Sequence, residues 1–294
     1  MTEDPRQDPR LRGKFDLRGE GPEGSGTGTS AGAYAGLGIQ FALSILLFTI
    51  GSSACGTPRV SLPSGPGSAA PDFAAAYAES RAACEGVRTL QAELGLSGRA
   101  AGQRMRGRVL TGIVPDALRL EGVAPFGAPV FILVADGTRG TLLLARDRRV
   151  VRDAEPGEIL NALIGIKLSP DDLRAVLAGC VRAASEATGA RAFGADWLAV
   201  DLAAGGSVYL RRTGTAWRIV AGRYGDLEID YPAFAGARPS RVVLRGKDLD
   251  LALSLNQVEV NGDLPRDQLV ALAIPDGVTP LSLEELRQAG PLGQ

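Results

Sequence analysis

Residues 90–151 read LQAELGLSGRAAGQRMRGRVLTGIVPDALRLEGVAPFGAPVFILVADGTRGTLLLARDRRVV, and this stretch decides the fold. Apolar and polar residues alternate along it, and a period of two sends successive side chains to opposite faces of a β-sheet. Proline, glycine and Asp-Gly turns divide the alternation into short segments. Consecutive short strands with tight connections predict an antiparallel meander.

The segments on either side of this stretch extend the pattern. Upstream, residues 71–90 (PDFAAAYAESRAACEGVRTL) have apolar residues at helical spacing, which predicts one helix. Downstream, residues 156–181 predict two short helices, the second beginning at Ser169-Pro170. After a loop, alternating strands resume at WLAVDLA (197–203) and continue to DQLVALAIP (267–275), and LSLEELRQAG (281–290) predicts a short surface helix.

Roughly a dozen antiparallel strands with helices inserted after the fifth predict a mainly β fold with α insertions. We expect a curved antiparallel sheet, an open β half-barrel closed by helices that lie on its concave side. Such a domain either fills its interior or leaves an apolar pocket.

Composition excludes several classes of function. The 32 basic and 33 acidic side chains nearly balance, so no strongly basic face for nucleic acid is expected. Histidine is absent and the three cysteines form no CxxC motif, which removes the usual acid–base group and metal ligands. We therefore expect no catalytic residue, no metal, no cofactor and no enzyme activity.

The N-terminal part of the chain indicates export. Residues 1–30 are rich in proline, glycine and charge, and we expect them to be disordered. Residues 31–54 form a hydrophobic signal or anchor segment, and its small residues before Cys55 resemble the lipobox of bacterial lipoprotein signals. That resemblance implies that Cys55 is lipidated, although Ser52 replaces the usual leucine. An uncleaved helix that anchors the chain is the alternative.

Residues 31–51 are also similar to the first transmembrane helix of AtpZ/AtpI membrane proteins, a likeness that ends at Cys55. Residues 55–71, which begin with the lipidated cysteine, are rich in proline, glycine and serine and predict a flexible tether. The main domain is expected over residues 72–276, followed by a C-terminal tail over 277–294 that includes the short helix.

The order of elements in residues 118–180 resembles the LolB/LolA family of outer-membrane lipoprotein receptors and carriers. The shared features are a strand ending in Pro125-Phe126-Gly127, a Gly137 turn between strands, and helices divided at Gly165 and Pro170. The likeness extends over about residues 72–262. It implies a LolB-like β-barrel domain whose cavity takes acyl chains of lipoproteins or another lipid.

The cavity implied by this resemblance would be lined by apolar residues of alternating strands and of the covering helices. The alternative is that each of them only fills a core. The candidates are Leu94, Leu96, Leu118, Leu120, Phe131 and Leu133 from strands, and Ile159, Leu160, Leu163, Leu173 and Leu177 from helices.

The turn Pro125-Phe126-Gly127 is a candidate membrane-insertion turn, because its counterpart in LolB carries an apolar residue that enters the membrane. A phenylalanine folded back onto the sheet is the alternative. Once Cys55 is lipidated, Cys84 and Cys180 are the two remaining thiols. An oxidising compartment favours a disulfide between them, and two separate buried thiols are the alternative.

These observations favour a lipid-anchored protein at the outer membrane or elsewhere in the cell envelope, facing the periplasm. It would bind acyl chains in its cavity and take part in lipoprotein or lipid transfer to the outer membrane. Membrane lipid, lipoprotein acyl chains and a periplasmic carrier protein are the expected partners. A membrane-anchored structural or assembly protein with a filled core and no ligand is the alternative function.

Acylation of Cys55 is a direct prediction. Metabolic labelling with a clickable fatty acid should mark the wild-type chain, because the cysteine thiol is the acceptor of the lipid. Cys55→Ala should remove the label. Label that survives in Cys55→Ala would contradict lipidation at this residue.

Overall fold

The computed structural model describes residues 59–124, 129–183 and 186–289 of the chain. The fold below is that of the unit Gly56–Gln294. Cys55, the hydrophobic segment 31–54 and the turn Pro125-Phe126-Gly127 lie outside the described residues.

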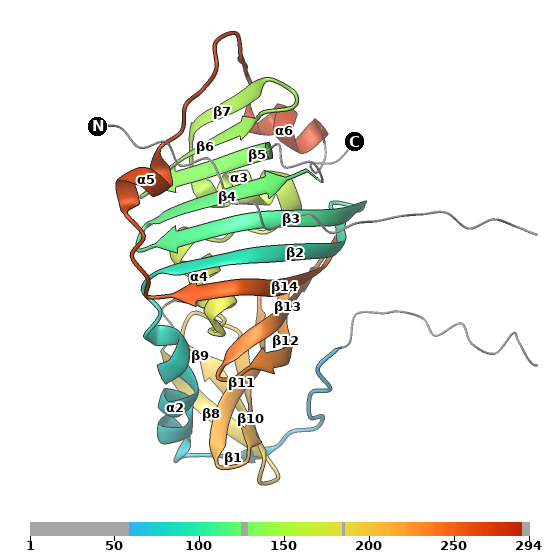
Figure 1. Cartoon of the computed structure of the whole chain (residues 1–294). Helices are drawn as coiled ribbons and strands as arrows, with labels where there is room; N and C mark the ends of the chain where they lie inside the picture. Colours follow the sequence, from blue (N-terminus) through green and yellow to red (C-terminus); the bar gives the residue numbers. More distant parts are fainter. Residues whose placement is uncertain (1–58, 125–128, 184–185, 290–294) are drawn as a thin grey trace, which may run out of the picture. The chain divides into compact units, whose positions relative to one another are not determined.

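All the described strands belong to one fifteen-stranded sheet, which consists of two antiparallel meanders (Figure 1). The long strands β14 and β2 pair with each other and thereby join the meanders. The first meander contains β2 (Leu90–Ala100), β3 (Gln103–Val114), β4 (Ala117–Val123), β5 (Pro129–Asp136), β6 (Arg139–Leu144) and β7 (Arg149–Ala154). The second contains β8 (Ala187–Phe193), β9 (Trp197–Leu202), β10 (Ser207–Thr213), β11 (Ala216–Tyr224), β12 (Leu227–Ala235), β13 (Arg238–Gly246) and β14 (Leu249–Val260).

Two very short strands end the sheet. β1 (Ser68–Ala69) pairs antiparallel with β8, and β15 (Thr279–Pro280) pairs parallel with β7. Because β1 and β15 lie at opposite ends of the strand order, the described strands form an open, curved sheet and not a closed barrel. The predicted fold class, a curved antiparallel sheet covered by helices, is confirmed. The described strands do not close into a barrel.

The hairpin between β2 and β3 turns in two residues. Ala101 and Gly102 both have positive φ, 47° and 77°, which is the backbone form that matches the twist of the flanking strands. Register is kept without a shift from the Ala100–Gln103 pair to the Leu90–Ile113 pair. Leu90, Leu94 and Leu96 of β2 therefore share one face with Met105 and Val109 of β3.

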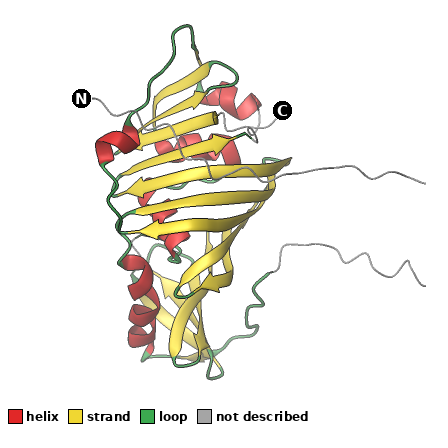
Figure 2. Ribbon diagram, viewed as in Figure 1, coloured by secondary structure: helices red, strands yellow, loops and turns green. Residues whose placement is uncertain are grey.

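Two helices cover the concave face of the sheet (Figure 2). α3 (Pro156–Ile164) and α4 (Pro170–Ala178) each begin with proline in the first turn, and each ends at a left-handed glycine. Ser169 Oγ accepts a hydrogen bond from the backbone N–H of Asp172, which fixes the start of α4. Asp171 and Asp172 are thus first-turn residues, as their position after Pro170 predicts.

The other described helices pack on other parts of the sheet or on α3 and α4. α2 (Phe73–Glu85) contacts β11 and α4, and α6 (Leu283–Ala289) packs on α3. Leu286 of α6 is only 1 % exposed, so this helix contributes to the core of the domain. No helix among the described residues has both the length and the apolar character needed to span a membrane.

Two of the predicted elements differ from the structure. The segment DQLVALAIP, expected as a strand, forms a short helix, α5 (Arg266–Val270). Leu269 of α5 covers Gly112 on the convex face, where it packs with Val114 and Ala117. The apolar run therefore caps the sheet instead of extending it. The region expected as a loop before residue 197 contains strand β8, whose small residues hide its period.

Cys84 at the end of α2 and Cys180 after α4 form a disulfide, with their Cα atoms 5.7 Å apart. Both residues are buried, and Tyr231 lies next to them, its hydroxyl donating a hydrogen bond to the Cys180 carbonyl oxygen at 3.0 Å. Burial raises the pKa of Tyr231 far above its ordinary value. The bond and the tyrosine together tie α2, α4 and β12 into one unit.

Removing the disulfide should destabilise the domain. The bond closes a loop of 96 residues, for which the chain-entropy model gives about 4.7 kcal/mol. Disulfides typically contribute about 2–4 kcal/mol, and Cys84→Ala/Cys180→Ala should lower the free energy of unfolding by that amount. Denaturant unfolding of wild type and variant measures this difference. Dithiothreitol should lower the stability of the wild type and leave the variant unchanged. Two free thiols in the exported wild-type protein would contradict the pairing.

Candidate functional site

An entirely apolar cavity of about 90 Å³ lies between the concave face of the sheet and helices α3 and α4. We call it the apolar slot. Strands β2, β3, β4, β5, β13 and β14 supply one wall, and α3, α4 and the loop between them supply the other. The lining residues are Leu94, Leu96, Met105, Val109, Leu120, Phe131, Leu160, Leu163, Ile164, Ile166, Leu168, Leu173, Leu244, Leu251 and Leu253.

Seven of the eleven predicted lining residues face the slot. They are Leu94, Leu96, Leu120, Phe131, Leu160, Leu163 and Leu173. Leu118, Leu133, Ile159 and Leu177 do not line the slot and are at most 1 % exposed, so they fill the core beneath it. Alternation thus predicts which face a residue occupies, but not how far along the strand the cavity extends.

Sequence reasoning missed about half of the lining residues. Met105 and Val109 share the alternation of β3, and could have been chosen by extending the pattern already used for β2. Leu244, Leu251 and Leu253 come from β13 and β14, which reach the slot through the pairing of β14 with β2. That pairing joins strands from opposite ends of the domain, and no local signal predicts it.

The slot continues into a wider opening of about 700 Å³, which shares Leu96, Met105, Val109 and Phe131 with it. We call this opening the β3 mouth. Its remaining lining residues are Arg106, Gly107, Arg108, Gly122, Val123, Ala124, Val130 and Arg146. The expected insertion turn, Pro125-Phe126-Gly127, lies outside the described residues, and its role stays a prediction.

The β3 mouth exists because the β2–β3 hairpin extends past the end of β4 (Figure 1). Pairing between β3 and β4 begins at Arg108 and Val123, so residues 103–107 of β3 pair with β2 alone among the described strands. Gly107 lies opposite Leu96, and a Cβ atom added to it would meet no atom within 4 Å. The edge of β3 is therefore open where the slot meets solvent.

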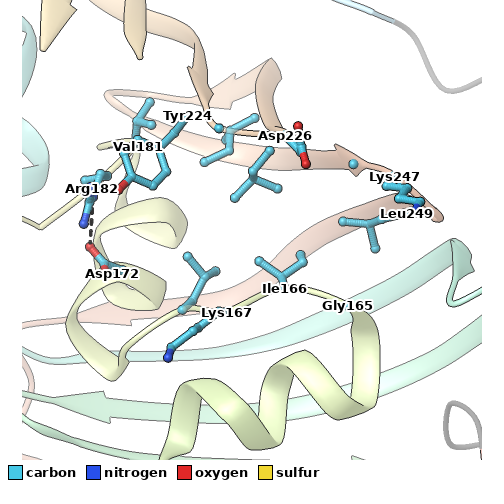
Figure 3. Close-up of a pocket in the computed structure, with 15 residues that line it drawn as sticks. Gly165, Ile166, Lys167, Asp172, Val181, Arg182, Tyr224, Asp226, Lys247 and Leu249 are labelled. Carbon is cyan, nitrogen blue, oxygen red and sulfur yellow. Dashed lines mark ion pairs between the residues drawn. The ribbon is translucent and has the colours of Figure 1, made fainter. Parts of the chain in front are cut away.

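A second opening of about 360 Å³, shown in Figure 3, lies at the other side of the slot and shares Ile166 and Leu168 with it. Here the loop after α3 faces the β11–β12 and β13–β14 turns. Arg182 lies over the Tyr224 ring at 4.1 Å and 3.8 Å from the Asp172 carboxylate. This opening is lined by side chains of both charge signs, with Lys247 and Asp226 also on its rim.

Lys167, which lines that opening, takes part in a network of ion pairs that includes α3 and α6. Its ammonium lies 3.1 Å from the Glu155 carboxylate and 2.9 Å from that of Glu158, and Arg287 of α6 contacts Glu158 at 3.1 Å. The hydrogen bond from Lys167 lowers the pKa of Glu158, and the same bond raises the pKa of Lys167. These groups are exposed, so the network mainly positions α6 and adds little stability.

The described residues contain no group of three or more side chains arranged to hold a metal ion. The walls of the slot offer no polar side chain, so the chemistry available there is apolar contact alone. The first charged side chains that a molecule leaving the slot through the β3 mouth would meet are arginines.

The chain matches no protein-family model and no curated protein by sequence. Solved structures similar to it include a LolA superfamily protein from Nitrosomonas europaea, with 12 % identity, a TM-score of 0.44 and coverage of 67 % of this chain and 97 % of that one. A DUF1329 family protein from Desulfovibrio piger has 9 % identity, a TM-score of 0.46 and coverage of 66 % and 95 %. The lipoprotein LppX from Mycobacterium tuberculosis has 10 % identity, a TM-score of 0.31 and coverage of 67 % and 99 %.

These likenesses concern the fold alone. What those proteins bind is not transferred to this chain by identities of 9–12 %. The described residues form a curved open sheet with covering helices.

Proposed function

We propose that this protein binds an acyl chain of a lipid or lipoprotein in the apolar slot and takes part in lipoprotein or lipid transfer at the cell envelope, anchored through Cys55. The observation that carries the proposal is the slot itself, which has fifteen apolar lining residues and opens to solvent through the β3 mouth. No catalytic group is needed for this function.

The energetics of the site support such a ligand. Transfer of acyl chain from water to an apolar wall contributes about 0.8 kcal/mol per CH₂, without directional bonds. The slot alone holds only the end of a chain, since about 90 Å³ is below the range of small-molecule sites. The β3 mouth, at about 700 Å³ and with four shared lining residues, provides room for the remainder.

A structural or assembly protein with a filled core is the second candidate. The small volume of the slot favours it, and so do Leu118, Leu133, Ile159 and Leu177, which are packed without access to solvent. The two candidates differ in one measurable property, because only the carrier holds lipid within the domain.

The test uses the full chain reconstituted in phosphatidylcholine liposomes that contain a phospholipid with a photoactivatable acyl chain. After irradiation, cleavage at glutamate gives peptides 94–121 and 122–155, which contain Leu96, Val109, Leu120 and Phe131. We expect lipid adducts on these peptides. A chain labelled only outside them, with no adduct on any slot residue, would favour the filled-core protein.

Gly107→Phe should block the β3 mouth. Gly107 lies in extended backbone opposite Leu96, and the space beside it is empty, so the ring can enter the mouth without displacing a neighbour. Adducts on peptides 94–121 and 122–155 should fall at least about tenfold, while the thermal midpoint stays near that of the wild type.

Gly189→Phe is the matched control. Gly189 is also a strand glycine with no atom within 4 Å of an added Cβ, but it belongs to β8 and lines none of the three openings described above. Its adducts should equal those of the wild type. Equal labelling of the Gly107 and Gly189 variants would show that lipid does not pass through the β3 mouth.

A further inference from the structure

We infer that the ligand of the apolar slot has an anionic, phosphate-bearing head group, which Arg106 and Arg146 bind at the β3 mouth. This inference rests on the proposed function and specifies the class of lipid. It is drawn from the charges around the β3 mouth. The apolar slot alone does not predict the charge of the ligand's head group.

The first step concerns the sign of the charge. Three arginines line the β3 mouth. Arg106 and Arg108 alternate with Met105 and Gly107, so they leave β3 on the opposite face and border the mouth at the open edge of the strand, and Arg146 lies in the turn between β6 and β7. None of the described residues that line the mouth is acidic. The opposite opening differs, because Asp172 and Asp226 line it together with its cationic side chains.

The second step concerns which of these arginines are available to a ligand. Arg108 lies 3.5 Å from the Glu93 carboxylate, so part of its charge is balanced. Arg106 and Arg146 are exposed and form no ion pair within the described part of the chain. Their guanidinium groups therefore present unused donors, in the planar arrangement that matches phosphate oxygens.

The third step concerns the direction in which a ligand enters. The slot has no polar lining, so a charged head group would lose its hydration there without gaining a partner. An amphiphile therefore places its tail in the slot and keeps its head in the mouth. Leu96 and Met105 line both spaces, so a molecule with its tail in the slot passes through the mouth that the arginines also line.

Two lipids with the same photoactivatable acyl chain test this inference in the full chain in phosphatidylcholine liposomes. One is phosphatidylglycerol, with an anionic phosphate head, and the other is neutral diacylglycerol. In the wild type, adducts on peptides 94–121 and 122–155 should be at least about tenfold more abundant with phosphatidylglycerol, as loss of a charge-assisted hydrogen bond predicts. Added salt should reduce this preference.

Arg106→Gln/Arg146→Gln should remove most of the preference and leave diacylglycerol labelling unchanged. The matched control is Arg99→Gln/Arg104→Gln, which removes two exposed charges from the same hairpin at positions that do not line the mouth. The control should retain the preference. An equal loss in both variants would show a general attraction to anionic membrane and overturn the head-group site.

The outcomes separate this inference from the proposed function. Equal slot labelling by the two lipids in the wild type contradicts the anionic head group and leaves acyl binding standing. Absence of slot labelling with either lipid contradicts acyl binding itself. Because Arg106 and Arg146 are exposed and form no ion pair among the described residues, their substitution should leave folding intact, which the thermal midpoint checks.

Discussion

The pairing of β14 with β2 is the contact on which the rest of the domain depends. It joins residues 249–260 to residues 90–100 and makes one continuous sheet from two meanders. Without it, Leu251 and Leu253 of β14 would be separated from Leu94 and Leu96 of β2, and the slot would lose one wall. The long sequence separation makes this contact costly in chain entropy, and burial of leucines on the concave face offsets that cost.

The helical insertion supplies the second wall of the slot, opposite the sheet that the pairing of β14 with β2 makes continuous. Residues 156–181 leave the sheet after β7, cross its concave face as α3 and α4, and return to the second meander. The disulfide from Cys84 to Cys180 holds the end of this insertion against α2. On β12, Asp230 is 1 % exposed and its buried charge is balanced by Arg245 and Arg223 from the neighbouring strands. The slot is thus the space that remains between the sheet and the helices α3 and α4, which these contacts hold in place.

Local patterns predict the class of fold and most of the residues that point inward. The period of two in β2 to β6 places Leu94, Leu96, Leu120 and Phe131 on one face, and the structure brings them together. The pattern fails where the paired strand is distant in the sequence, or where the residues suit a strand and a helix equally well. β8 is made of small and polar residues, and the apolar run at Leu269 is equally compatible with a strand or a helix until its contact with Gly112 decides for a helix. The strand pattern does not single out the arginines of the β3 mouth, because their position at an opening depends on where β4 ends.

The last described residues protect an exposed margin of the sheet. The backbone N–H groups of Thr279 and Leu281 donate to the carbonyl oxygens of Arg148 and Val150, and so occupy the hydrogen-bonding edge of β7. Arg149 contacts Glu285 at 3.0 Å and holds α6 beside that edge. An unoccupied edge strand is a template for another chain, so the segment after residue 276 acts as a built-in blocker of self-association. Proteolytic loss of this short segment would expose the hydrogen-bonding edge of β7 to other chains and would also uncover the side of α3 on which α6 packs.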